Sequence, residues 1–123
     1  VKNMPTFPSI WAEIKGYLNN NIVLAHNASF DMSVLKSILN TYNLEKPNFK
    51  YYCTVSLAKK VWPELENHKL NTLASYFNIN FKHHNALHDS KVCAMVAVLA
   101  TRKLNSKNFA QLITKLNLKD NKF

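Results

Sequence analysis

Glycine is almost absent from this chain. Gly16 is the single glycine among 123 residues, whereas average usage is roughly 7%. Turns that need a left-handed backbone therefore cannot be built on glycine in the usual way. Either asparagine takes that place, since it is abundant here and tolerates the left-handed conformation, or the most turn-rich part of a larger domain lies outside this sequence.

Cysteine and long apolar runs are also scarce. Cys53 and Cys93 stand alone in the sequence, which excludes a disulfide framework and a zinc-binding spacing. Both lie among apolar residues, so we expect buried free thiols in a reducing cytoplasm. No apolar run approaches the roughly 18 residues that a membrane span requires, and the N-terminus shows no signal pattern. We therefore expect a cytoplasmic protein with no membrane partner.

Acidic residues are few. Seven aspartates and glutamates face sixteen lysines and arginines, which gives a net charge of +9 at pH 7. A surplus of this size favours an anionic partner, most often nucleic acid; a proteome rich in lysine and asparagine would give the same balance without any such partner. Apolar residues make up 47% of the chain, which excludes a disordered tail and suits one domain or most of one.

Apolar spacing predicts an α/β fold that is rich in helices. Short apolar runs at 22–25 and 49–53 indicate strands. Helical spacing follows the first proline pair and each strand, and it recurs in a long helix at about 86–103 and a final one around 109–116. One face of the long helix is expected to be buried, because apolar residues recur on it at helical spacing: Val92, Cys93, Val96 and Leu99. Thr54 can cap the helix after the second strand. Two strands are too few for a stable sheet, so we expect only the remnant of a larger one.

Two of the three aspartates stand at predicted helix starts. Asp31 follows the first strand by a short turn, where open α/β sheets place their ligand groups. Asp89 closes the run His83-His84-Asn85-Ala86-Leu87-His88-Asp89. Such a carboxylate can hold Mg²⁺ and such an imidazole can accept a proton from water, whereas the spacing does not fit zinc. Each acid would equally complement a helix dipole. Asp120 lies in a polar tail, where we expect it to be solvated.

The two segments around these acids resemble a known family. Leu24-Ala25-His26-Asn27-Ala28-Ser29-Phe30-Asp31 is similar to the second motif of the DEDDh (DnaQ-like) 3′–5′ exonucleases, and His84-Asn85-Ala86-Leu87-His88-Asp89 is similar to their third motif, H-x-A-x-x-D. The segments Cys53-Thr54-Val55-Ser56-Leu57-Ala58, His68-Lys69-Leu70-Asn71-Thr72-Leu73 and Met4-Pro5-Thr6-Phe7 also look like family segments. The resemblance thus spans about residues 4–103.

The resemblance implies a role for each matching residue. Asp31 and Asp89 would hold the metal, with Asp89 as a direct ligand, and His84 would be the general base. Asn27 and Phe30 would shape the substrate pocket, while His26 would be structural. The implied fold is an incomplete RNase H-like α/β fold, helix-rich, with a remnant of the central mixed sheet. The chain 1–123 would then be the C-terminal two-thirds of a single exonuclease domain.

The family's first motif, D-x-E, has no counterpart in this sequence. The only acid before Asp31 is Glu13, which lies in a predicted helix. Two carboxylates are a thin ligand set for the two Mg²⁺ or Mn²⁺ ions of the complete domain, so we expect weak or absent binding here. Without the preceding strands, the run 22–25 would be an exposed edge, and self-association through it is expected.

The resemblance implies hydrolysis of terminal phosphodiesters of single-stranded nucleic acid by a two-metal, His-assisted mechanism, impaired in this chain. The partners would be 3′ ends of single-stranded DNA or RNA, with a polymerase as a further candidate. The main alternative is a non-catalytic fragment or a nucleic-acid- or protein-binding module derived from such an exonuclease. An unrelated helical domain with chance motif matches is the third.

Overall fold

A three-stranded mixed sheet connects the two halves of the molecule. The computed structural model describes residues 6–80, 82 and 85–123. Its strands β1 (Ile22–Ala25), β2 (Lys50–Cys53) and β3 (Asn121–Lys122) lie in that order. β1 and β2 are parallel, while β3 pairs with β2 in the antiparallel sense. The strand predicted at 22–25 is confirmed and the second begins one residue later than predicted.

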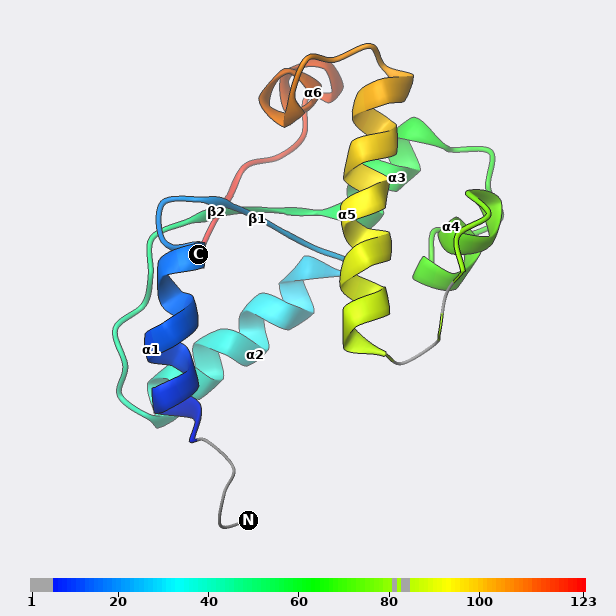
Figure 1. Cartoon of the computed structure of the whole chain (residues 1–123). Helices are drawn as coiled ribbons and strands as arrows, with labels where there is room; N and C mark the ends of the chain where they lie inside the picture. Colours follow the sequence, from blue (N-terminus) through cyan, green and yellow to red (C-terminus); the bar gives the residue numbers. More distant parts are fainter. Residues whose placement is uncertain (1–5, 81, 83–84) are drawn as a thin grey trace.

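The described residues form six helices that pack around this small sheet. Their bounds are α1 (Phe7–Leu18), α2 (Ala28–Thr41), α3 (Thr54–Val61), α4 (Leu70–Tyr76), α5 (Ala86–Lys103) and α6 (Phe109–Leu116). α1 and α2 lie together on one side of the sheet, while α5 stands beside α3 and α4 at the other end and α6 covers the top of α5 (Figure 1). The helix-rich α/β prediction is therefore confirmed. Within the described residues, no helix is long and apolar enough to cross a bilayer.

The core lies between α3, α4 and α5. Leu57, Leu73, Val92 and Val96 are almost completely buried there. The face of α5 that the helical spacing predicted as buried does pack inward, although Leu99 is only partly covered. Because α5 contacts both α3 and the end of β1, its packing holds the strand end and the helical half together.

Thr54 does not cap α3, contrary to the sequence prediction. Cys53 is the N-cap residue and makes no side-chain capping bond, while Thr54 is the first helical residue and is completely buried. Its hydroxyl is turned into the core, where it is hydrogen-bonded to His26 and Cys93. A buried hydroxyl needs hydrogen-bond partners, and the Thr54 hydroxyl finds them in these two side chains instead of capping the helix.

Asp120 is exposed, as expected of a solvated tail residue, but it also has partners that the sequence did not predict. Its carboxylate accepts a hydrogen bond of 2.5 Å from the Tyr52 hydroxyl and pairs with Lys50 at 3.3 Å. Burial and the bonded carboxylate raise the pKa of Tyr52 to about 12. Asn121–Lys122 form the third strand by pairing with β2, which the sequence did not predict. Phe123 then stacks on Phe49 with ring centroids 4.5 Å apart.

Asparagine occupies the left-handed positions that glycine would normally take. Six asparagines have positive φ angles between 50° and 70°, whereas Gly16 lies inside α1. The six are Asn20, Asn27, Asn43, Asn78, Asn105 and Asn117. The first of the two readings of the glycine scarcity is therefore confirmed: asparagine builds these turns.

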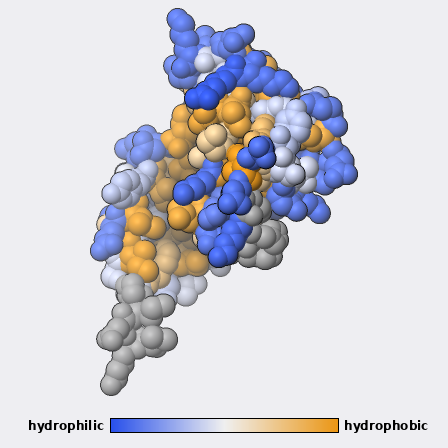
Figure 2. Space-filling view, turned by 45° about the vertical axis from the view of Figure 1, so that its right-hand side comes forward, coloured by the Kyte–Doolittle hydropathy of each residue, from blue (hydrophilic) through white to orange (hydrophobic). Residues whose placement is uncertain are grey.

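Exposed apolar side chains gather on the part of the molecule that contains α1, β1 and the start of α2. Ile10, Ile14, Ile22, Phe30 and Val34 all belong to these elements and are exposed. Figure 2 shows apolar surface on the lower left of the molecule, interrupted by hydrophilic side chains. β1 is also an edge strand of the described sheet, since β2 is its only neighbour there.

Candidate active site

Asp31 is placed by a tight strand-to-helix turn. β1 ends at Ala25, and α2 begins at Ala28 after only two residues. Asn27 makes this turn possible because its φ of 70° is left-handed, a conformation that asparagine tolerates better than most residues. Asp31 then lies in the first turn of α2, where the helix dipole favours a negative charge.

Asp89 has the same position on a different helix. Asn85 caps α5: its side-chain oxygen accepts a hydrogen bond of 3.1 Å from the backbone N–H of His88. The backbone N–H of Asp89 donates to the carbonyl oxygen of Asn85 at 2.9 Å. The capped first turn therefore holds the Asp89 backbone in a fixed place.

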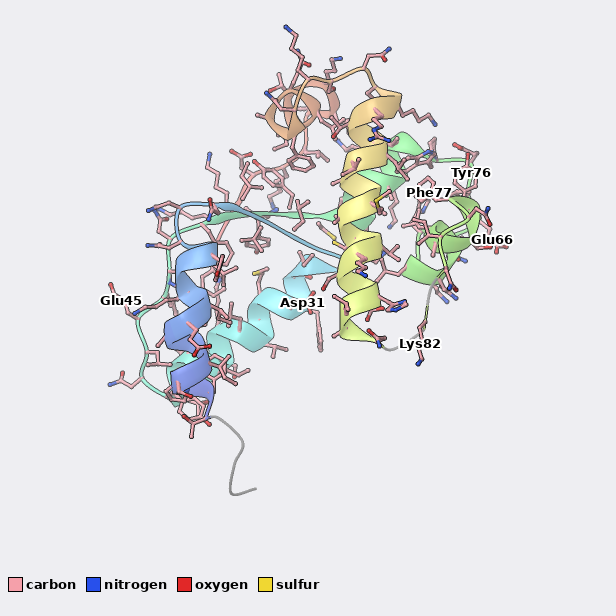
Figure 3. The ribbon with its side chains drawn as sticks, in the orientation of Figure 1. Asp31, Glu45, Glu66, Tyr76, Phe77 and Lys82 are labelled. Carbon is pink, nitrogen blue, oxygen red and sulfur yellow. The ribbon has the colours of Figure 1, made fainter. Side chains whose placement is uncertain are left out.

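The two aspartates line one cavity of about 450 Å³. The cavity lies between the end of β1, the start of α2 and the first turns of α5, and His26 and Cys93 also line it. Figure 3 shows Asp31 on the side of α2 that faces α5. Two residues that are 58 positions apart in the sequence thus face the same space. His84, the third predicted site residue, and His83 lie outside the residues that the structure describes.

The cavity combines negative side chains with two helix N-termini. Burial raises the pKa of the Asp31 carboxyl above its usual value, and the nearby His26 ring acts in the opposite direction. Carboxylate oxygens are the ligands that Mg²⁺ and Mn²⁺ prefer, and the cavity presents two such groups. In the ranges that the structure describes, no group of three or more His, Cys, Asp or Glu side chains is placed to hold a metal ion.

The two residues predicted to shape the substrate pocket are not among the side chains that line this cavity. Asn27 lines a second cavity of about 370 Å³, together with Cys53, Lys59 and Lys119. Phe30 projects from α2 with 65% of its surface exposed. An exposed aromatic ring beside Asp31 is available for stacking on a base, but its role stays a prediction.

Cys53 has an environment that the sequence did not indicate. We expected a buried and ordinary thiol, but Cys53 is half-buried and its sulfur accepts a hydrogen bond of 3.5 Å from the backbone N–H of Ala28. Burial raises its pKa, yet backbone N–H groups at the starts of α2 and α3 outweigh this and lower the pKa below the usual value. Only the packing of two helix starts against one sulfur produces this effect, and no sequence spacing signals it.

Several lysines stabilise helix ends. Lys60 Nζ donates to the carbonyl oxygen of Leu116 at 2.9 Å, and Lys115 Nζ donates to that of Leu104 at 2.7 Å. Lys103 Nζ donates to the carbonyl oxygen of Val61 at 3.1 Å. Cations at helix C-termini satisfy orphan carbonyl groups and complement the dipole. Some of the excess lysines therefore have a structural role, so the net charge overstates how many lysine side chains are available to contact an anionic partner.

Comparison with known families agrees with the motif assignment. The family model described as RNase_T, Exonuclease, matches residues 1–97. DNA polymerase III PolC-type from Oceanobacillus iheyensis is 31% identical over 111 residues, which is 89% of this chain and 8% of the relative. The PolC-type polymerase of Listeria welshimeri is 35% identical over 98 residues, 79% of this chain and 7% of the relative. The chain thus spans less than a tenth of the length of these curated relatives.

A solved structure shares the fold. Exonuclease X in complex with 5′ overhanging duplex DNA superposes with a TM-score of 0.66 at 23% identity. The match covers 94% of this chain and 65% of that one. The arrangement of helices around the small mixed sheet is therefore the RNase H-like arrangement that the two motifs implied.

Proposed function

The chain belongs to the RNase_T exonuclease family, and on that premise we propose that it contributes the Asp31–Asp89 half of a metal-dependent 3′–5′ exonuclease site. The observation that carries the proposal is the shared cavity, because two acids from separate motifs line it although they are distant in the sequence. Residues 1–123 would form the C-terminal two-thirds of one exonuclease domain.

The residues of the two motifs would divide the work of such a site as follows. Asp31 and Asp89 would hold Mg²⁺ or Mn²⁺ through their carboxylate oxygens, with Asp89 as the direct ligand. A bound cation would stabilise the charge that develops on the phosphate. The dipoles of α2 and α5, whose first turns carry the two acids, favour the ionised carboxylates. His84, on the run that leads into α5, accepts the proton of the attacking water.

The substrate would be the 3′ end of single-stranded DNA or RNA, released as nucleoside 5′-monophosphates. Two kinds of relative support this: PolC-type DNA polymerase III and an exonuclease seen with duplex DNA that carries an overhang. Phe30 would stack on a terminal base, and Asn27 would lie along the strand. The proposed protein partner is a replicative polymerase and the proposed location is the cytoplasm, because bacterial polymerases are among the relatives.

Cation binding tests the proposal without requiring turnover. In a Mn²⁺ titration followed by NMR line broadening, the resonances of the first turns of α2 and α5 should broaden first. Asp31→Asn and Asp89→Asn should each weaken this binding at least several-fold, because each removes an anionic ligand. Glu45→Gln is the matched control, since Glu45 lies in the loop after α2, away from the cavity (Figure 3).

Binding of single-stranded nucleic acid is the second measurement. Mn²⁺ should tighten binding of a single strand with a free 3′ hydroxyl more than binding of the same strand blocked at its 3′ end. Mn²⁺ affinity that neither aspartate variant changes would refute the proposed site. Equal Mn²⁺ effects on the free and blocked strands would refute the proposed substrate end.

A further inference from the structure

A chain of hydrogen-bonded side chains lies beneath the two aspartates. His26, which directly follows β1, places its Nδ1 atom 2.8 Å from the Thr54 hydroxyl oxygen and its Nε2 atom 2.7 Å from the carbonyl oxygen of His68. The Thr54 hydroxyl oxygen is also 3.4 Å from the Cys93 sulfur. Both His26 and Cys93 line the Asp31–Asp89 cavity. The chain therefore runs from one wall of the cavity to the other.

One neutral arrangement of protons satisfies every member of this chain. A carbonyl oxygen can only accept, so Nε2 of His26 must carry a proton. In a neutral ring Nδ1 then accepts, and the Thr54 hydroxyl must donate to it. The Thr54 oxygen is left to accept from the Cys93 thiol. Burial lowers the pKa of His26 and raises that of Cys93, so both groups favour the neutral forms that this order requires.

The chain joins the elements that carry the two aspartates. Cys93 lies one helical turn after Asp89 on α5, on the same face of the helix. His26 lies between β1 and the turn that leads through Asn27 to Asp31. Thr54 is completely buried at the start of α3 and bridges the two. A displacement of α5 along the end of β1 would thus break the Thr54–Cys93 contact and move Asp89 relative to Asp31.

A second histidine holds the far end of the chain in place. His68 Nε2 lies 2.7 Å from the carbonyl oxygen of Trp62, so it donates to that oxygen. This hydrogen bond joins the two ends of the loop between α3 and α4. It holds in position the His68 carbonyl oxygen, which accepts the hydrogen bond from His26. Trp62, in turn, is buried against the ring of Phe77.

We propose that His26 is a positioning residue of the site, and that it fixes the separation of Asp31 and Asp89 through Thr54 and Cys93. It acts as the neutral Nε2–H tautomer and does not touch the cation or the substrate. This inference rests on the function proposed above, since it assigns the network a purpose in the same site. It goes further by making the geometry of the two acids depend on a histidine and a threonine that carry no charge.

Matched substitutions separate positioning from simple core stability. Thr54→Val keeps the volume and removes the hydroxyl, while Thr54→Ser keeps the hydroxyl. His26→Gln retains a donor for the His68 carbonyl, and His26→Asn retains an acceptor for the Thr54 hydroxyl. Val61→Ala is the control for stability, because Val61 is a buried α3 residue at the opposite end of that helix from Thr54.

The first measurement needs neither metal nor activity. Long-range ¹H–¹⁵N NMR spectra should show His26 as the neutral Nε2–H tautomer. Amide exchange in the segment from Asp89 to Cys93 should rise about tenfold in Thr54→Val relative to the rest of the core, because one hydrogen bond is lost. It should stay near the wild-type value in Thr54→Ser, whereas Val61→Ala should raise exchange across the whole core. The opposite tautomer, or a uniform rise in Thr54→Val, overturns the proposal.

The second measurement is Mn²⁺ affinity, taken at a temperature where all variants are folded. Thr54→Val and His26→Gln should weaken Mn²⁺ binding several-fold, because each removes the bond between residue 26 and the Thr54 hydroxyl. His26→Asn, which keeps that bond and loses only the one to the His68 carbonyl, should weaken it less, and Thr54→Ser and Val61→Ala should leave it unchanged. Wild-type affinity in Thr54→Val overturns the positioning role. If the unmodified chain binds no Mn²⁺, the proposed function fails for this chain, and the exchange pattern then decides by itself whether His26 and Thr54 hold α5 in place.

Discussion

At the scale of single residues, asparagine takes over the work that glycine does in most proteins. Helix α4 shows how: after its C-cap Phe77, Asn78 is left-handed, with a φ of 57°. The backbone N–H of Ile79 then reaches back to the carbonyl oxygen of Ala74 at 2.7 Å, and that of Asn78 reaches Ser75 at 3.1 Å. These are the two bonds of a Schellman motif. The same pair of bonds closes α2, α5 and α6, with Asn43, Asn105 and Asn117 at the left-handed position.

We predict that Asn78→Ala lowers the free energy of unfolding by about 1 kcal/mol, because a left-handed backbone is costly for a residue with an ordinary Cβ. Asn78→Gly should change it by no more than about 0.5 kcal/mol, since glycine adopts this conformation freely. Urea denaturation measures both. Asn80→Ala, at an exposed asparagine just beyond the motif, is the control. Equal losses in the alanine and glycine variants would show that the side-chain amide matters more than the backbone angle.

Residue-scale prediction succeeded where the signal was local. The abundance of asparagine beside a single glycine offered asparagine turns as one of two explanations, and the structure shows asparagine at the left-handed positions. The pairing of Asp120 was not predicted because its partners, Tyr52 and Lys50, are about 70 positions away in the sequence. Thr54 failed for the same reason, since a threonine before an apolar run looks like a cap until its long-range partners are known.

At the scale of elements, α5 connects the core with the site. Its first turn carries Asp89, its middle holds Cys93, and its buried face packs against α3 and α4. Helical spacing alone located this helix and its inner face. The spacing could not locate β3, because two polar residues carry no alternation and become a strand only by pairing with β2.

We predict that Val96→Asp unfolds the chain. Val96 is 0% exposed in α5, and an ionised carboxylate there has no partner, which costs several kcal/mol. That is comparable with the whole stability of a domain, about 5–15 kcal/mol. Val98→Asp is the matched control because Val98 is 42% exposed on the same helix, and it should change stability by no more than about 0.5 kcal/mol. Circular dichroism melting curves compare the two. A cooperative transition at the wild-type temperature in Val96→Asp would contradict the assignment of this face to the core.

At the scale of the whole molecule, the unpaired edge of β1 is the most consequential feature. The strand is apolar and has β2 as its only partner in the described sheet, and exposed apolar side chains of α1 and α2 lie around it. Unpaired strand edges invite pairing with another chain. The family motifs predicted this edge from the sequence, because they place a further strand beside it. What they could not predict was the extent of apolar surface left open on the neighbouring helices.

We predict that the purified chain self-associates through this edge and that Ile22→Lys reduces the association, since a charged side chain on an edge strand opposes pairing. Ile22 is 49% exposed. Tyr76→Lys is a control of similar exposure, 51%, on α4 at the other end of the molecule (Figure 3). Sedimentation velocity over a range of concentrations should show larger species for the wild type and for Tyr76→Lys. Unchanged association in Ile22→Lys would place the contact elsewhere.

The same edge leads to the last prediction, which concerns activity. With Asp31 and Asp89 as the acids of the cavity, the donor set is small for a pair of Mg²⁺ ions, which dehydrate reluctantly. A general base such as His84 contributes only about 10²–10⁴-fold, while the stabilisation of developing charge depends on the metal. We therefore predict that residues 1–123 alone release almost no mononucleotides from a 3′-labelled single strand.

Joining a family segment that carries D-x-E on an apolar strand to Val1 should restore that release. The added strand would pair with the open edge of β1, and its two carboxylates would enter the cavity beside Asp31 and Asp89. Mg²⁺- or Mn²⁺-dependent release should then appear together with a loss of self-association, because one strand accounts for both. His84→Ala in the joined protein should remove most of the activity. A D-x-E segment with both acids changed to amides should prevent self-association but should not restore cleavage. Robust metal-dependent release by residues 1–123 alone, abolished by His84→Ala, would show instead that other groups of the chain replace the missing carboxylates.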